Sequence, residues 1–139
     1  MLNRLDRFKE YGPIFIRLII GFHLVYGTQD NLFSYARMEE FAAFLSAHNV
    51  PFPLFAAFVS AYAQFICGIL FIFGAATRYA ALVMIINFVA AILIAHLGDP
   101  YPTKFPALMM LSGACFLFLH GPGELSVDRL LARRAERGQ

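Results

Sequence analysis

The sequence predicts an all-helical (all-α) integral membrane protein, a four-helix bundle with a short amphipathic helix in its first extracytoplasmic loop. The chain has 139 residues, of which 60% are hydrophobic and only 14% are charged, whereas soluble domains usually carry about 25% charged residues. From Pro53 to His120 the sequence is almost entirely apolar, and only Arg78 and the segment 99–104 interrupt it. In water such segments would form exposed patches that drive aggregation. We therefore expect the chain to lie in a lipid bilayer as a single domain.

Four segments have the length and composition of membrane-spanning helices, which need about 20 predominantly apolar residues. Pro13 suits the first turn of the first helix, where its missing N–H costs nothing. Gly121-Pro122-Gly123 stops the last helix, because proline cannot continue a helix and glycine permits a left-handed cap. The predicted spans cover residues 13–29, 54–76, 79–97 and 105–120.

The first span also has features of a cleaved signal peptide, since Arg4, Arg7 and Lys9 precede its apolar run. The residues that follow it, 27–30, do not form a small-x-small cleavage site, and three more spans come after them. We therefore expect the first helix to be retained.

Two shorter helices are predicted outside the spans. Over residues 37–47, apolar side chains recur at helical spacing with polar ones on the opposite face. This helix is expected to lie on the membrane surface or to cap the mouth of the bundle. After the fourth span, Ser126 can cap a helix over residues 126–137, with Asp128 in its first turn and arginines that face anionic lipid head groups.

Four spans place both termini on one side of the bilayer, and the positive charges indicate which side. Lys and Arg are concentrated in the cytoplasmic segments of membrane proteins. We therefore expect both ends in the cytoplasm and the long first loop outside. The terminal side collects Arg4, Arg7, Lys9, Arg78, Arg129, Arg133, Arg134 and Arg137, and the other side collects Arg37 and Lys104.

Polar side chains inside the spans are the candidate functional residues, because ionisable and amide groups are costly in hydrocarbon. At about 1.5 Å of rise per residue, His23, Gln64 and Asn87 fall near the bilayer midplane, with Ser112 at a similar level. Together they would form a polar chamber that holds a quinone head group or relays a proton, with His23 titrating near neutral pH. Alternatively, Gln64 and Asn87 only hydrogen-bond across helices and fix the packing.

Two further candidates lie nearer the ends of their spans. Arg17 is about one turn inside the cytoplasmic boundary. Its side chain either reaches back to the head groups or turns inward to hold an anionic group of a substrate. His96 lies at the outer end of the third span with Asp99 close by, and it would serve the outer mouth.

Cys67 and Cys115 fall at similar depth on different helices, so the sequence allows a disulfide or a redox role for them. A free buried cysteine, however, often behaves as a small hydrophobic residue. The spacing of His, Cys, Asp and Glu predicts no metal site, and three histidines at three depths argue against a bis-histidine haem. A net charge of +2 without a basic, aromatic-interleaved stretch argues against nucleic acid.

Small residues recur every seven positions on one face of each of the first two spans. Ala61, Gly68 and Ala75 share a face of the second span, as Gly21 and Thr28 do in the first. Small residues let helices approach closely in lipid. We therefore expect a tight bundle rather than a wide pore.

Several short motifs, taken in order, carry a family resemblance that covers nearly the whole chain. They are Arg17–Phe22 and Tyr26–Gly27 in the first span, Val50–Pro53 before the second, Gln64–Gly68 and Phe73–Arg78 within and after it, Ala95–His96 closing the third, and Gly121–Asp128 after the fourth. With these motifs the chain resembles the DoxX family of small four-helix membrane proteins. The resemblance implies a multi-pass protein of a bacterial or archaeal plasma membrane.

The resemblance also implies a redox setting. Some relatives are described as subunits of a thiosulfate:quinone oxidoreductase, and others as membrane anchors in redox-defence complexes. Many relatives carry Glu where this chain has Gln64. Because an amide neither takes up nor releases a proton, we do not expect a proton relay at this position.

We predict a DoxX-like membrane component of a redox or quinone-linked system, at most a subunit of an oxidoreductase. It would work with a partner membrane or redox protein, or as a homo-oligomer, with a quinone as the cofactor that the chamber would hold. Two other hypotheses stay open: a structural accessory subunit or assembly factor without its own ligand, and a membrane carrier or binding protein for a small molecule. The candidate ligand-binding residues are Arg17, His23, Gln64, Asn87 and His96, and the redox candidates are Cys67 and Cys115.

Overall fold

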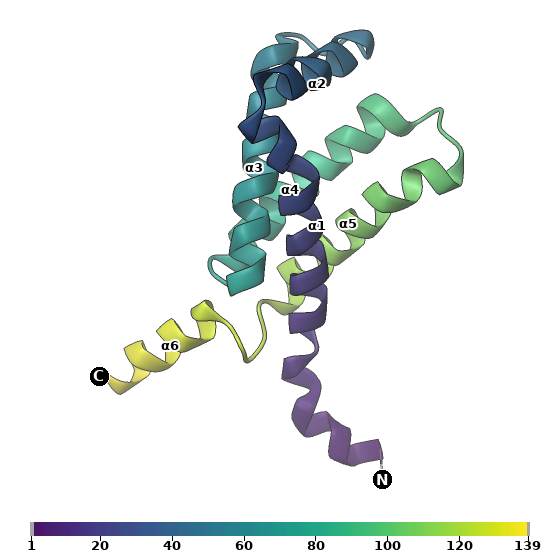
Figure 1. Ribbon diagram of the computed structural model, residues 1–139. Coiled ribbons are helices and arrows are strands. Elements are labelled where there is room, and N and C mark those ends of the chain that lie inside the picture. Colours follow the sequence, from purple (N-terminus) through teal and green to yellow (C-terminus); the bar gives the residue numbers. More distant parts are fainter. Residues whose placement is uncertain (1, 139) are drawn as a thin grey trace.

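The computed structural model describes residues 2–138, and within them it contains helices and no strand (Figure 1). Four helices are long and apolar enough to cross a membrane, which confirms the predicted all-helical membrane fold. The elements in order are the 3₁₀ helix η1 (Leu2–Tyr11), α1 (Pro13–Phe33), α2 (Tyr35–Ala47), α3 (Pro53–Phe73), α4 (Thr77–Ala91), the π-helical segment η2 (Ile92–His96), α5 (Tyr101–His120) and α6 (Val127–Arg137).

The spanning helices differ from their predicted bounds at a few ends. Helix α1 continues to Phe33, beyond the predicted end at residue 29. Helix α5 begins at Tyr101 rather than at residue 105, because Pro102 lies in its first turn, where a missing N–H costs no hydrogen bond. Helix α3 ends at Phe73, where Gly74 adopts a left-handed conformation with φ of 67°.

The four long helices pack as two pairs. Helix α1 packs mainly against α3, and α4 packs mainly against α5. Figure 1 shows that the α4–α5 pair leans away from α3 toward the end of the molecule that carries α2. We call this end the α2 end, and the opposite end, where η1 and α6 lie, the terminal end. The divergence of α4 from α3 is the feature that positions the candidate site.

Helices α1 and α3 make their closest approach at two glycines. A Cβ atom added to Gly21 would lie 2.7 Å from the carbonyl oxygen of Gly68, and one added to Gly68 would lie 2.9 Å from the carbonyl oxygen of Gly21. Both distances are too short for a real contact, so neither position has room for a side chain. The small-residue faces recognised in the sequence therefore meet here, and they bring the two backbones together.

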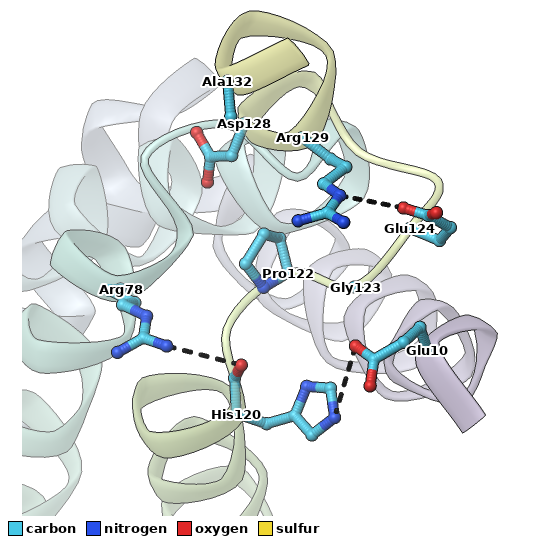
Figure 2. A pocket seen from close by; sticks show the side chains of 9 residues that line it. All are labelled: Glu10, Arg78, His120, Pro122, Gly123, Glu124, Asp128, Arg129 and Ala132. Carbon is cyan, nitrogen blue, oxygen red and sulfur yellow. Dashed lines mark hydrogen bonds and ion pairs between the residues drawn. The ribbon is translucent and has the colours of Figure 1, made fainter. Parts of the chain in front are cut away.

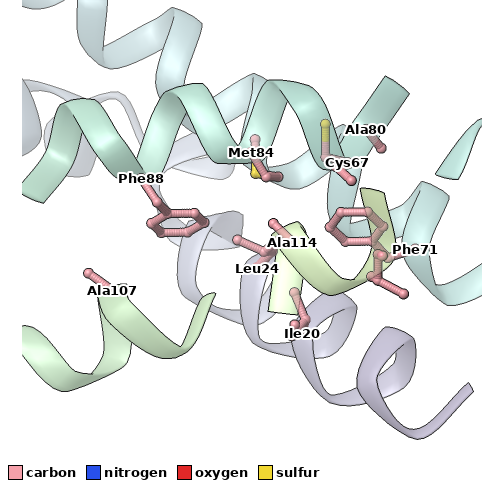
Figure 3. Packing of buried hydrophobic residues seen from close by; sticks show 11 residues of the cluster. Ile20, Leu24, Cys67, Phe71, Ala80, Met84, Phe88, Ala107 and Ala114 are labelled. Carbon is pink, nitrogen blue, oxygen red and sulfur yellow. The ribbon is translucent and has the colours of Figure 1, made fainter. Parts of the chain in front are cut away.

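Two apolar clusters hold the helices in place. In the larger one, Leu24 of α1, Phe71 of α3, Met84 and Phe88 of α4 and Ala114 of α5 are buried against one another (Figure 3). Close packing, rather than removal of apolar surface from water, stabilises such a cluster in lipid. A smaller cluster joins α2 to the first half of α3. Its buried members are Met38, Ala42, Ala57 and Ala61.

Candidate functional site

A chain of polar side chains links α3 to α4 near the middle of both helices. The Gln64 amide N–H donates to Ser60 Oγ over 3.0 Å, and Ser60 Oγ donates to Asn87 Oδ1 over 2.8 Å. Ser60 and Gln64 lie four residues apart on α3, so they share one face of that helix. The structure thus brings together two of the predicted site residues, Gln64 and Asn87, through a serine that the sequence analysis did not single out.

These bonds leave one donor group and one acceptor unused. Within residues 2–138, neither Asn87 Nδ2 nor Gln64 Oε1 has a hydrogen-bond partner. An amide carries two N–H donors and an acceptor oxygen. The linkage therefore fixes the two amides while keeping polar atoms free for a ligand.

A cavity of about 280 Å³ lies beside this linkage at the α2 end. We call it the α3–α4 cavity. Its polar wall contains Ser60, Gln64, Asn87 and His96. Aromatic and aliphatic side chains form the remaining wall, and α2 contributes Phe41, Phe44 and Leu45. A mostly apolar pocket with a few convergent polar groups is typical of a small-molecule site.

His96 also lines this cavity, and the orientation of its ring is fixed by a partner. Its Nδ1 lies 2.8 Å from Asp99 Oδ2. Because a carboxylate only accepts hydrogen bonds, Nδ1 carries the proton in this pair, and in the neutral ring Nε2 is an acceptor. His96 belongs to η2, the π-helical segment at the end of α4. Single π-helical turns inside α-helices occur frequently at functional sites.

His23 and Ser112 do not belong to the chamber that the sequence predicted. Both side chains are exposed on the outer surface of their helices, and neither lines the α3–α4 cavity. The expectation of a chamber containing His23 was wrong, because depth alone placed it there. In α1 the inward face instead carries Arg17, Gly21, Leu24 and Thr28, all buried.

Arg17 turns inward, and its guanidinium group is used by the protein itself. The side chain is 2% exposed. It donates four hydrogen bonds to backbone carbonyls, to Phe71 and Ile72 at the end of α3 and to Pro122 and Leu125 in the segment before α6. An arginine has five N–H donors. One donor is left, so this arrangement holds the chain together and leaves little for an anionic substrate.

A second pocket of about 280 Å³ lies at the terminal end, where charged side chains of several elements meet. Figure 2 shows Arg78 directed toward the carbonyl oxygen of His120 and the His120 ring directed toward Glu10. Arg129 pairs with Glu124 at 3.0 Å in the same view. These contacts fasten the segment after α5 to the ends of η1 and α4.

Asp128 completes this attachment. Its carboxylate accepts hydrogen bonds from the backbone N–H of Ala76 at 2.7 Å and of Thr77 at 2.9 Å. These N–H groups open α4, where an anion is favoured by the helix dipole. Gly74 accepts a further bond from the Asp128 N–H at 3.0 Å. The terminal-end pocket is thus built from contacts that close the fold.

The two cysteines are free thiols. Cys67 is buried in the larger apolar cluster and Cys115 is half-buried. Between residues 2 and 138, no group of three His, Cys, Asp or Glu side chains is arranged to hold a metal ion.

Sequence reasoning missed Ser60 and Asp128 as structural partners. Ser60 had a signal, since it lies one turn before Gln64 on the same helix face. For Asp128 the sequence predicted only a place in the first turn of its own helix. Its hydrogen bonds to the backbone at the start of α4 were not predicted.

Comparison with known proteins supports the membrane assignment. The family model described as DoxX matches residues 12–97, more than half of the chain. The chain is also similar to the uncharacterized membrane protein Rv3486 of Mycobacterium tuberculosis, with 33% identity over 101 residues, which cover 63% of this chain and 62% of the relative. The match thus spans less than two thirds of that relative's length. No solved structure matches the chain.

Proposed function

Because this chain belongs to the DoxX family, we propose that it binds a small lipid-soluble molecule as the membrane component of a redox or quinone-linked system. The observation that carries the proposal is the α3–α4 cavity, whose mostly apolar wall includes Asn87 and Gln64. Among residues 2–138, Asn87 Nδ2 and Gln64 Oε1 have no hydrogen-bond partner. An unpaired amide in a membrane span is costly unless a ligand or another polar group satisfies it. A ligand in the cavity would supply the missing partners.

A quinone head group fits this set of residues. The cavity volume of about 280 Å³ lies just below the usual range for ligand pockets, which begins at about 300 Å³, so the cavity suits a single substituted ring. A quinone carbonyl would accept from the Asn87 N–H, and the hydroxyl of the reduced form would donate to Gln64 Oε1 or to His96 Nε2. When bound, the quinone supplies the capacity to carry electrons, and the side chains bind and orient its ring.

The proposal includes a partner for the redox step. The family resemblance favours a partner membrane or redox protein, or a second copy of this chain. Solubilisation in a mild detergent followed by identification of the proteins that co-purify would test this part. Recovery of the chain alone as a monomer from its native membrane would count against it.

Ligand binding can be tested with a tryptophan placed in the cavity wall. The chain contains no tryptophan, so Phe44→Trp introduces a single reporter on α2. We expect 2,3-dimethoxy-5-methyl-1,4-benzoquinone, a quinone head group without a chain, to quench this fluorescence saturably in lipid nanodiscs. Adding Ser60→Ala removes both hydrogen bonds of the linkage, which should weaken binding about fivefold to tenfold.

The matched control is Ser112→Ala, the same change at an exposed position of α5. It should leave the quenching curve unchanged. If the head group quenches without saturation, or if both serine variants bind as the parent does, the cavity is not its site. Quenching without saturation would favour the structural accessory hypothesis over the small-molecule carrier hypothesis, whereas unchanged binding in both serine variants would point to a binding site elsewhere on the protein.

We also propose that the protein lies in a bacterial or archaeal plasma membrane with its terminal end in the cytoplasm. The excess of Lys and Arg at that end supports this orientation. Glu39 of α2 and Glu136 of α6 are both exposed. A membrane-impermeant maleimide should label Glu39→Cys in intact cells, and Glu136→Cys only after the membrane is opened. The reverse pattern would place the termini outside.

A further inference from the structure

A groove on the outer surface of α3 and α4 adjoins the α3–α4 cavity. It has a volume of about 400 Å³ and is lined by Val59 and Ala63 of α3 and by Val83 and Ile86 of α4, among others. Val59 is 53% exposed and Ile86 is 64% exposed. Because both helices are membrane spans, these side chains face lipid. We call this hollow the α3–α4 groove.

The groove and the cavity share part of their walls. Ala56, Ser60, Asn87 and Ala90 line both hollows. The hydrogen bond between Ser60 and Asn87 crosses from one helix to the other at this shared wall. The two hollows therefore adjoin where α3 and α4 meet. Figure 1 shows that these helices diverge toward the α2 end.

The polar groups are distributed unevenly between the two sides. Gln64 and His96 line the cavity and not the groove. Apart from Ser60 and Asn87, the groove is lined by alanine, valine, isoleucine and phenylalanine. The composition of the cavity side therefore suits a polar ring, and that of the groove side suits an apolar chain beside small residues.

We propose that the α3–α4 groove is the entrance from the bilayer to the cavity, and that it holds the chain of the ligand. The ligand would be an amphiphile with a compact polar ring and a flexible apolar chain, with its ring in the cavity. This inference rests on the proposed function, and it adds the place where the apolar chain of the ligand is held and the route by which the ligand arrives.

The apolar chain of the ligand should add little binding affinity by itself. An apolar chain in the groove replaces the same chain in lipid, so burial gives no net hydrophobic gain. Filling the groove with a larger side chain is therefore the sharper test. The apolar chain of the ligand would then clash with a packed surface, and this overpacking would weaken binding. A head group without a chain does not meet this obstacle.

The experiment compares two probes on the Phe44→Trp reporter in nanodiscs. One is the benzoquinone head group used above, and the other is the same ring with a decyl chain. The concentration of each probe is expressed as its mole fraction in the membrane. Ala63 lines the groove and not the cavity, so Ala63→Phe fills the groove. We expect this variant to weaken the decyl probe at least about tenfold and to change binding of the head group less than about twofold.

Two further variants keep the test decisive. Val83→Phe fills the groove from its α4 side, at a side chain that is 42% exposed. It replaces Ala63→Phe in the experiment if that variant does not fold. Val89→Phe makes the same change outside both hollows, and it should leave both probes unaffected.

The outcomes separate this inference from the proposed function. If groove variants weaken neither probe, or weaken both equally, the groove does not hold the chain, while saturable quenching by the head group still supports the cavity. If neither probe quenches the parent reporter saturably, the proposed function fails and this inference fails with it. A loss confined to the decyl probe supports both.

Discussion

Replacing Arg17 by leucine is expected to lower the free energy of unfolding by about 3–5 kcal/mol and to release the C-terminal segment. The reason is the number and position of its partners. Its four hydrogen bonds reach two carbonyls at the end of α3 and two in the segment before α6. Hydrogen bonds to a charged group contribute about 1.5–3 kcal/mol each. Arg17→Leu also removes the cost of burying the guanidinium group, so we expect a net loss smaller than the sum of the four bonds.

The measurement is unfolding by SDS in mixed micelles, combined with limited trypsin digestion. Trypsin cleaves after Arg129 and Arg133, so faster cleavage there reports that the segment has detached. Arg134→Leu provides the control, because Arg134 is exposed on the same terminal end, and it should change stability by less than about 0.5 kcal/mol.

Arg17→Lys separates charge from geometry. Lysine keeps the positive charge, but its three N–H donors lie on one nitrogen and cannot reproduce the planar, forked arrangement of donors in a guanidinium group. We expect a stability between those of the parent and of Arg17→Leu. If Arg17→Leu kept the parent's stability and lost quinone binding instead, the ligand-holding role predicted from the sequence would replace the structural one.

The contrast between Arg17 and His23 shows what depth along a helix can and cannot predict. The rise per residue gives the depth of each residue in the bilayer, with His23 near the midplane and Arg17 closer to the cytoplasmic boundary. The side of the helix on which a residue lies depends instead on the rotation, one turn per 3.6 residues. Arg17, Gly21, Leu24 and Thr28 follow that period and are buried. His23 lies off it and is exposed. A check of the period against the small-residue face would have removed His23 from the predicted chamber.

The spans were predictable because their length and apolar composition are properties of single segments. The cavity was not, because it exists where α4 diverges from α3, and an angle between helices is a property of packing. Gln64 and Asn87 were identified in the sequence because an amide side chain is costly to place in hydrocarbon. The serine that links them was not identified, because the sequence analysis did not treat a single hydroxyl group as a comparable cost. The π-helical turn that carries His96 also had no sequence signal that we recognised.

Replacing Gly21 by alanine is expected to lower the free energy of unfolding by about 1–3 kcal/mol, the usual cost of overpacking a closely packed interface. The added Cβ would lie 2.7 Å from the carbonyl oxygen of Gly68 and 2.8 Å from Cγ1 of Ile72. The first of these atoms belongs to the backbone, so α1 and α3 must move apart to accommodate the methyl group. Gly27→Ala is the matched control on the same helix, because a Cβ there meets no atom within 4 Å.

Gly27→Ala should leave stability unchanged or raise it by up to about 1 kcal/mol, since alanine favours a helix more than glycine does. Adding Ile72→Ala to Gly21→Ala relieves the contact with a side chain but not the contact with the carbonyl oxygen, so it should not restore the parent's stability. SDS titration in mixed micelles compares all three variants. Equal stability of Gly21→Ala and Gly27→Ala would mean that α1 and α3 do not cross at these glycines in the membrane.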